Sequence, residues 1–200
     1  MRKFIFLAFI NLVFIIAADG QTQPPYKNPE LSIEQRVNDL LQRMTPEEKF
    51  WQLFMIPGNL DNVKPGQYHH GIFGFQVSAE SANGNAAQQM LHYGTKENAA
   101  SLAKKINAIQ KYFVDSSRLG IPIIAFDEAL HGLVRSGATA FPQAIGLAAT
   151  WDTSMMSEVA NAIATQTKIR GIRQILSPVI NIATDVRWGR TEESMGEDPY

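Results

Sequence analysis

Charged and polar side chains stand directly after two apolar runs of this sequence, at residues 121–126 and 175–182. The residues concerned are Asp127, Glu128, His131, Asp185, Arg187 and Arg190. An ionised aspartate can accept hydrogen bonds from two adjacent hydroxyl groups, and an arginine presents a rigid fork of donors to hydroxyl oxygens. This chemistry suits a ligand rich in hydroxyl groups. We therefore predict a sugar-binding site among these residues.

Both charged clusters also have a purely structural interpretation. Asp127 could cap a helix or turn that begins at Glu128, a common role for an aspartate after a strand. The charged segment 185–198 could form a solvated ion network that makes the loop rigid. That second interpretation is the expected one for Arg187, Glu193, Glu197 and Asp198. Trp188 is expected to anchor the loop from beneath and not to stack on a ligand.

The histidines do not have the spacing of a metal site. His131 lies near the predicted site, where a lone histidine more often orients backbone through a hydrogen bond than transfers protons. His69 and His70 are adjacent and would point to opposite sides of an extended segment. The sequence has no HxxxH or HExxH spacing and no P-loop, GxGxxG or GxSxG motif. We predict no metal ion and no cofactor.

Composition excludes further classes of function. The chain has 200 residues, of which 45% are hydrophobic, enough for one sizeable core. Its 18 basic and 19 acidic residues give a net charge of -1 and form no basic stripe, so we expect no nucleic-acid or anionic-lipid partner. The absence of cysteine excludes disulfides, thiolate nucleophiles and cysteine-bound zinc.

Helical periodicity occurs in several segments that could position these side chains. Predicted helices occupy residues 32–44, a short stretch that starts with a capping box of Thr45 and Glu48, residues 96–117, and residues 152–170. Gly120 and Gly171 stand where the last two helices would end.

Short apolar runs between the helices predict strands at 71–77, 121–126 and 175–182, with a surface loop at 78–85. The last two runs do not alternate, so we expect each to be buried on both faces of a parallel sheet covered by helices, the α/β class. Ligands bind beyond the carboxyl ends of such strands, where both charged clusters stand. The connection 127–151 is longer than most structureless loops, so it is expected to carry function.

The first 20 residues predict a secretory signal peptide. Two basic residues precede an apolar run at 4–18, and Ala18 and Gly20 are small residues suited to cleavage. A membrane anchor is the alternative, but a spanning helix needs roughly twenty apolar residues. Residues 21–31 contain three prolines and predict an extended linker, so the folded domain is expected at 32–200. We expect a periplasmic or secreted protein with no membrane attachment after cleavage.

Four blocks of the sequence, in order, resemble glycoside hydrolase family 3. They are Met-Thr-Pro-Glu-Glu-Lys at 44–49, Asp-Glu-Ala-Leu-His-Gly at 127–132, the segment from Phe141 to Asp152, and Arg-Trp-Gly-Arg at 187–190. The resemblance extends over nearly all of residues 32–200. It implies the N-terminal portion of a (β/α)8 TIM-type barrel, truncated before its later strands, whose further partner is the remainder of its own chain.

The resemblance also implies a reaction. Family members of the β-glucosidase type hydrolyse terminal nonreducing β-D-glucosyl residues of β-linked oligosaccharides or glycosides by a retaining two-carboxylate mechanism. Asp127 and Arg190 match the family's sugar-binding aspartate and arginine. The family's nucleophile is an aspartate in a Ser-Asp-Trp setting that follows a Lys-His pair, and neither sequence occurs before Tyr200. We therefore assign no catalytic residue here, expect the nucleophile and acid/base beyond Tyr200, and expect the isolated segment to fold poorly and be inactive.

Three further functions are compatible with the same residues. Residues 129–152 also resemble β-xylosidases of the same family, although a glutamate is common in them where this chain has Asp127. A noncatalytic carbohydrate-binding relic would keep Asp127 and Arg190 without turnover. In a sensor or scaffold domain, the charged loop would be only structural.

Overall fold

The structure is a computed structural model that describes residues 23–58, 60, 63–77 and 97–199. The predicted signal peptide and the predicted loop at 78–85 lie outside these residues. The chain divides into two compact units, Met1–Thr45 and Pro46–Tyr200, and the parallel sheet belongs to the second.

Helix α2 (Ile33–Arg43) of the first unit confirms the helix predicted at 32–44. A capping box fixes its start, because Ser32 Oγ accepts a hydrogen bond from Gln35 N at 3.2 Å. In return the Gln35 side chain accepts one from Ser32 N at 3.1 Å.

The segment predicted to be an extended linker contains one turn of 3-10 helix, η1 (Pro25–Lys27). Tyr26 N donates to Asp39 Oδ2 at 3.1 Å, and Arg36 Nε donates to Tyr26 O at 3.0 Å. These bonds hold η1 on α2, so the linker prediction is wrong for these residues. Proline marks a break in longer helices, but it is compatible with a first helical turn, where no backbone donor is needed.

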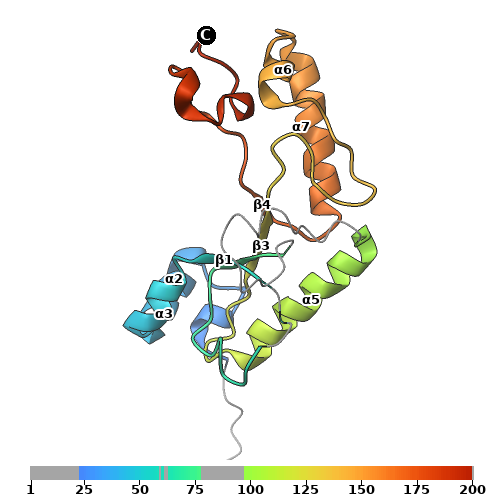
Figure 1. Ribbon diagram of the computed structural model, residues 1–200. Helices are drawn as coiled ribbons and strands as arrows, with labels where there is room; N and C mark the ends of the chain where they lie inside the picture. Colours follow the sequence, from blue (N-terminus) through green and yellow to red (C-terminus); the bar gives the residue numbers. More distant parts are fainter. Residues whose placement is uncertain (1–22, 59, 61–62, 78–96, 200) are drawn as a thin grey trace, which may run out of the picture. The chain divides into compact units, whose positions relative to one another are not determined.

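The second unit contains a four-stranded parallel sheet in the order β1-β2-β3-β4 (Figure 1). Its strands are β1 (Met55–Pro57), β2 (Gly74–Gln76), β3 (Ile124–Asp127) and β4 (Gln174–Ile175). In the register, Phe75 lies opposite Ala125, and Asp127 lies opposite Ile175. The α/β class predicted from the alternation of helices and apolar runs is confirmed.

The strands agree with the sequence prediction in the centre of the sheet and differ at its edges. The strands predicted at 71–77 and 121–126 are β2 and β3. The predicted strand at 175–182 is reduced to β4, because Pro178 has no N–H to donate to a sheet. Strand β1 was not predicted, since three residues next to a helix give no periodic signal.

Helices of the second unit lie close to the segments that the sequence indicates, with the exception of α6. They are α3 (Pro46–Trp51), α5 (Ala99–Ser116), α6 (Ala144–Ala148) and α7 (Thr153–Lys168). Asn98 Oδ1 caps α5 by accepting from Ser101 N at 2.9 Å, and Asp152 Oδ1 caps α7 by accepting from Met155 N at 2.9 Å. Helix α6 was not predicted; it lies inside the long connection between β3 and α7.

The core of the second unit forms between the strands and α5, which runs beside the sheet (Figure 1). The fully buried side chains of α5 are apolar and recur at helical spacing: Leu102, Ile106, Ile109 and Phe113. Phe75 of β2 meets Phe113 edge to face, with ring centroids 5.6 Å apart. This packing holds β3, and therefore the residues that follow it, in a fixed position.

The segment after β4 is more exposed than predicted. Leu176, Ile180 and Ile182 are all exposed apolar side chains, and Ile180 is 86% exposed. Among the described residues β4 pairs with β3 alone, so the burial on both faces that was predicted for 175–182 is not found. No helix within the described ranges is both long and apolar enough to cross a bilayer.

Candidate functional site

Asp127 is the last residue of β3, and its side chain is only 2% exposed. Its Oδ1 accepts a hydrogen bond from Glu128 N at 2.9 Å, which is the capping contact that a purely structural role predicts. Its Oδ2 accepts a hydrogen bond from Arg135 Nη2 at 3.1 Å. Asp127 therefore lies at the carboxyl end of the strand, as expected, with both oxygens held by neighbouring groups.

Arg135 is a site residue that the sequence prediction missed. Its side chain is 1% exposed and forms a buried ion pair with Asp127. A charged group is rarely buried without an opposite charge, so this pair compensates the cost of burial for both residues. The only sequence signal was an arginine directly after the apolar Leu133 and Val134, which does not by itself identify the partner.

Arg135 belongs to a loop that folds back on itself after β3. Phe141 N donates to His131 O at 2.7 Å, and His131 Nδ1 forms a hydrogen bond with Phe141 O at 2.8 Å. The prediction that His131 orients backbone is confirmed. Gly132 has φ +124°, and a Cβ there would lie 2.2 Å from Thr139 O, so the two sides of the loop touch at a residue without a side chain.

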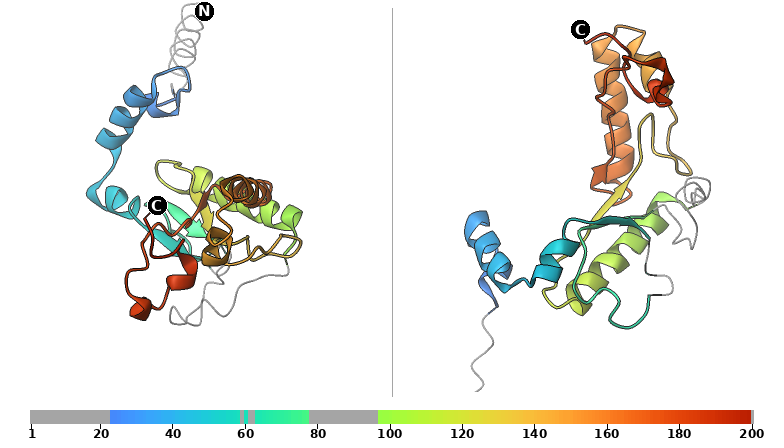
Figure 2. Two further views of the ribbon diagram at one scale, coloured as in Figure 1. Left: turned by 90° about the horizontal axis from the view of Figure 1, so that it is seen from above. Right: turned by 60° about the vertical axis from the view of Figure 1, so that its left-hand side comes forward.

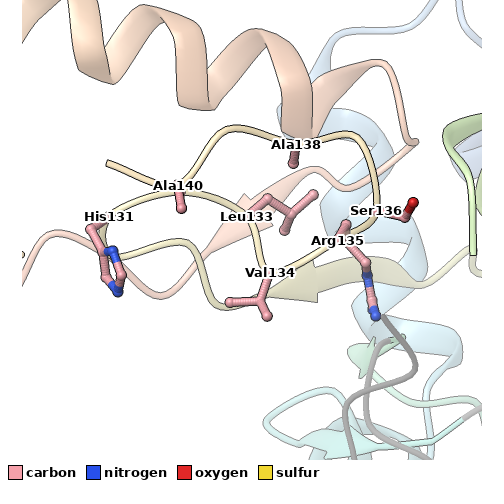
Figure 3. A pocket seen from close by; sticks show the side chains of 8 residues that line it. His131, Leu133, Val134, Arg135, Ser136, Ala138 and Ala140 are labelled. Carbon is pink, nitrogen blue, oxygen red and sulfur yellow. The ribbon is translucent and has the colours of Figure 1, made fainter. Parts of the chain in front are cut away.

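A cavity of about 600 Å³ opens along this loop (Figure 3). Its lining residues all belong to one segment: His131, Gly132, Leu133, Val134, Arg135, Ser136, Ala138 and Ala140. Arg135 and Val134 leave the loop on one side, whereas Ser136 points away from it (Figure 3). The long connection 127–151 thus holds both the buried ion pair and a concave surface.

The second charged cluster forms ion pairs on an exposed loop that includes η2 (Val186–Trp188) and η3 (Thr191–Glu193). Arg187 Nη2 donates to Asp185 Oδ2 at 2.6 Å. Arg190 Nε donates to Glu193 Oε1 at 3.0 Å. The predicted ion network is confirmed for Arg187 and Glu193. For Glu197 and Asp198, which are exposed, it stays a prediction.

Trp188 does not pack beneath the loop as predicted. Its side chain is 36% exposed, and the Arg190 guanidinium lies 6.0 Å from its ring centroid. Directly after η3, Ser194 is the fully buried side chain instead. Ser194 Oγ donates to Thr191 O at 2.8 Å.

Glu128 connects the two clusters electrostatically. Burial raises the pKa of the Glu128 carboxyl above its usual range, the negative charges of Asp127 and Glu193 add to this increase, and Arg190 opposes it. Conversely, Glu193 raises the pKa of Arg190, and Glu128 contributes to that increase. Helix α6 contacts η3, which brings the second cluster beside the connection that follows β3 (Figures 1 and 2). Glu128, for which no binding role was predicted, is therefore the half-buried carboxyl within electrostatic range of Arg190.

Comparison with known proteins decides the family. The model of the glycosyl hydrolase family 3 N-terminal domain matches residues 47–200. The chain belongs to glycosyl hydrolase family 3. The match begins one residue inside the second compact unit, Pro46–Tyr200, and includes both charged clusters.

Relatives within family 3 include enzymes named for two sugars. The chain is 29% identical over 203 residues to a putative β-xylosidase of Formosa agariphila, a match that covers all of this chain and 26% of that protein. It is 33% identical over 189 residues to β-glucosidase C of Emericella nidulans, covering 88% of this chain and 28% of that protein. The chain thus spans less than a third of the length of these relatives.

A solved structure has the same fold over the matched part. A β-glucosidase structure from Erythrobacter marinus aligns with a TM-score of 0.69 at 32% identity, covering 90% of this chain and 23% of that one. The parallel sheet with its helices is consistent with a partial TIM-type barrel. In such barrels the strand carboxyl ends carry the site, and in this family 3 chain Asp127 and Glu128 stand at that end of β3. Among the described residues, no three histidine or acidic side chains are grouped to hold a metal ion.

Proposed function

We propose that this chain provides the sugar-binding edge of a retaining β-glucosidase that acts on terminal nonreducing β-D-glucosyl residues. One observation carries the proposal: Asp127 and Glu128 stand at the carboxyl end of β3, and Glu128 is electrostatically coupled to Arg190 of the second cluster. Carboxylates and a guanidinium at a strand end supply the acceptors and donors that sugar hydroxyls require.

The three side chains have different parts in this proposal. Asp127 is buried and held by Arg135, so it fixes the end of β3. The lone pairs of its carboxylate that are not used by Arg135 and Glu128 N can accept hydrogen bonds from a sugar hydroxyl. Glu128 is half-buried and has a raised pKa, which suits a carboxyl that accepts from a hydroxyl group or shares a proton with it. Arg190, whose side chain is 57% exposed, would exchange part of its pairing with Glu193 for the ligand.

The nucleophile and the acid/base are proposed to come from parts of the protein other than these 200 residues. In this proposal, the 200 residues contribute to sugar binding, and turnover needs the full-length protein. The test is to measure hydrolysis of 4-nitrophenyl β-D-glucoside and β-D-xyloside by the full-length protein, and to identify the first-formed anomer by NMR. Turnover of the glucoside with retained β configuration supports the proposal, whereas inversion or no turnover contradicts it.

A β-xylosidase of the same family is the second candidate, favoured by the match to the putative β-xylosidase that covers all of this chain. Xylose lacks the hydroxymethyl group of glucose, so the two candidates differ in kcat/KM for the two substrates. Sugar binding without turnover of either substrate would favour a noncatalytic relic. If Asp127→Ala and Arg190→Ala both keep the sugar binding and the turnover of the parent protein, the site assignment is contradicted.

We further propose that the protein is exported to the periplasm or beyond, on the basis of the signal-like sequence of the first 20 residues. Mass spectrometry of the mature N-terminus tests this. A protein that starts near Gln21 in the secreted or periplasmic fraction supports export with cleavage, and an intact Met1 found in the cytoplasmic fraction alone contradicts it.

A further inference from the structure

Two side chains at the C-terminal end of α7 hold the loop that carries Arg135. Gln166 Oε1 accepts a hydrogen bond from Thr139 N at 2.8 Å, and Gln166 Nε2 donates to Thr139 Oγ1 at 2.9 Å. Arg170, two residues after the helix, donates from Nη2 to Ser136 O at 3.0 Å. These bonds join residues 27 and 34 positions apart in the sequence, so they fix the loop to a separate element and not to itself.

Arg170 is placed for this role at an energetic cost. It is 3% exposed, and its Nε is buried without a hydrogen-bond partner among the described residues. Burial lowers the pKa of the Arg170 guanidinium, and the nearby positive charge of Arg135 lowers it further. The two terminal nitrogens are used instead: Nη1 donates to Gln166 O at 2.7 Å and Nη2 to Ser136 O, so the guanidinium links the end of α7 to the loop.

Between its closure at His131 and Phe141, the loop has little regular structure of its own. Its backbone bonds near Arg135 are short turns, Arg135 N to Leu133 O at 2.8 Å and Ala138 N to Arg135 O at 3.0 Å. Gly137 adopts φ +73°, a conformation that is easy for glycine to leave. The bonds from Gln166 and Arg170 therefore hold the backbone on both sides of Gly137, next to Arg135.

We propose that Gln166 and Arg170 are positioning residues of the sugar site: they fix the 135–139 loop, and through Arg135 they fix the Asp127 carboxylate. The inference rests on the proposed function, because it concerns the same site. Neither residue touches the sugar. Their effect on binding comes from keeping Arg135 Nη2 at Asp127 Oδ2, and small displacements of such groups weaken binding and turnover strongly.

The second unit offers a matched control at the other end of β3. Gln110 of α5 makes an equivalent pair of bonds to Ile123, with Nε2 donating to Ile123 O at 2.6 Å and Oε1 accepting from Ile123 N at 3.0 Å. Ile123 precedes β3, at its amino end, whereas Asp127 is at its carboxyl end. Both glutamines thus tie a helix to a neighbouring segment, and only one of them adjoins the proposed site.

The experiment compares Gln166→Met with Gln110→Met in the full-length protein. Titration with D-glucose and D-xylose gives Kd, 4-nitrophenyl glycosides give KM and kcat, and thermal unfolding gives Tm. We expect Gln166→Met to weaken sugar affinity and raise KM by about tenfold, as for a misplaced binding group, and Gln110→Met to lower Tm with affinity within about twofold of the parent protein.

Two further variants keep the test decisive. Gln166→Glu should restore affinity, because a carboxylate still accepts from Thr139 N and the Thr139 hydroxyl can turn to donate to its second oxygen. Thr139→Ala removes only the hydroxyl bond, and we expect a smaller loss of affinity in the same direction should Gln166→Met not fold.

The outcomes separate this inference from the proposed function. If the parent protein binds sugar and both methionine variants keep its affinity, or lose it equally, the positioning role is overturned while the function stands. If Gln166→Glu is as weak as Gln166→Met, the inference also fails. If the parent protein binds neither sugar, the proposed function fails, and the positioning role that rests on it fails with it.

Discussion

Arg135 donates from Nη2 to Asp127 Oδ2 over 3.1 Å, and both side chains are almost completely excluded from solvent. The pair joins the end of β3 to the loop that lines the cavity. An ion pair of this kind contributes less to stability than its Coulomb attraction suggests, because both charges lost their hydration on burial. Replacing only one of the two residues costs more stability, because the charge of the other then stays buried without an opposite charge.

We therefore predict that Arg135→Met lowers the free energy of unfolding by roughly 3 to 5 kcal/mol, the range for breaking a buried pair. The double variant Asp127→Leu with Arg135→Met should recover part of this loss, because no charge is left in the interior. Urea denaturation of the parent, the single and the double variants measures both values. A double variant less stable than the single one would contradict the prediction.

A second ion pair tests whether a loss of stability elsewhere in the unit also lowers sugar affinity. Arg118 Nε donates to Glu48 Oε1 at 2.6 Å, with the Glu48 side chain 4% exposed. Glu48 precedes β1 and Arg118 precedes β3, so the pair lies toward the amino ends of the strands. We predict that Arg118→Met costs about 1 to 3 kcal/mol of stability, as for a hydrogen-bonded buried charge, and leaves sugar affinity unchanged. Urea denaturation and sugar titration of the same preparation check this, and a loss of affinity would contradict it.

Glu128 should make stability depend on pH. Its folded-state pKa is raised above the ordinary value of 4.5, so the folded protein binds more protons than the unfolded chain between that value and the folded-state pKa. Stability from this group is present below pH 4.5 and falls as pH rises through the folded-state pKa. Glu128→Gln removes the effect, and we expect the variant to gain stability relative to the parent protein over that interval. Urea denaturation of both proteins at a series of pH values measures the difference, and a difference that stays constant with pH would exclude the assignment.

Arg190 and Arg187 lie in the same loop and are both exposed, yet we expect them to differ in sugar binding. Arg190 is electrostatically coupled to Glu128, whereas Arg187 pairs with Asp185. Loss of a charge-assisted hydrogen bond to a ligand weakens binding by roughly 10- to 100-fold, which we predict for Arg190→Ala. Arg187→Ala is the control and should keep the affinity of the parent protein. Titration with D-glucose measures both, and equal effects would show that the loop as a whole, not Arg190, is responsible.

Helices were the most predictable part of the fold. The apolar stripe of α5 and the cap at Asp152 are local features that the sequence shows directly, and the structure confirms both. Strand β1 and helix α6 are short, and their positions depend on pairing with β2 and contact with η3, which no local pattern reveals. The same limit applied to β4, where a run of apolar residues was expected to remain in a strand beyond Ile175.

The site was predictable in its location but not in its pairing. A strand that ends in Asp127 places a carboxylate at the sheet edge, and this could be seen in the sequence. The burial of that carboxylate against Arg135 could not, because it depends on how the loop after β3 folds back. Glu128 received no binding role in the sequence prediction for the same reason, since its electrostatic interaction with Arg190 joins segments about sixty residues apart in the sequence.

Gly132 has a consequence for how this protein can change. Any side chain at this position would meet Thr139 O, and the backbone conformation disfavours every other residue as well. In a saturation library of the loop, we expect position 132 to accept glycine alone, whereas the exposed Val134 and Ser136 accept many replacements. Sequence variation of the loop would then enter through those two positions, while the close approach of residues 132 and 139 stays the same in every folded variant.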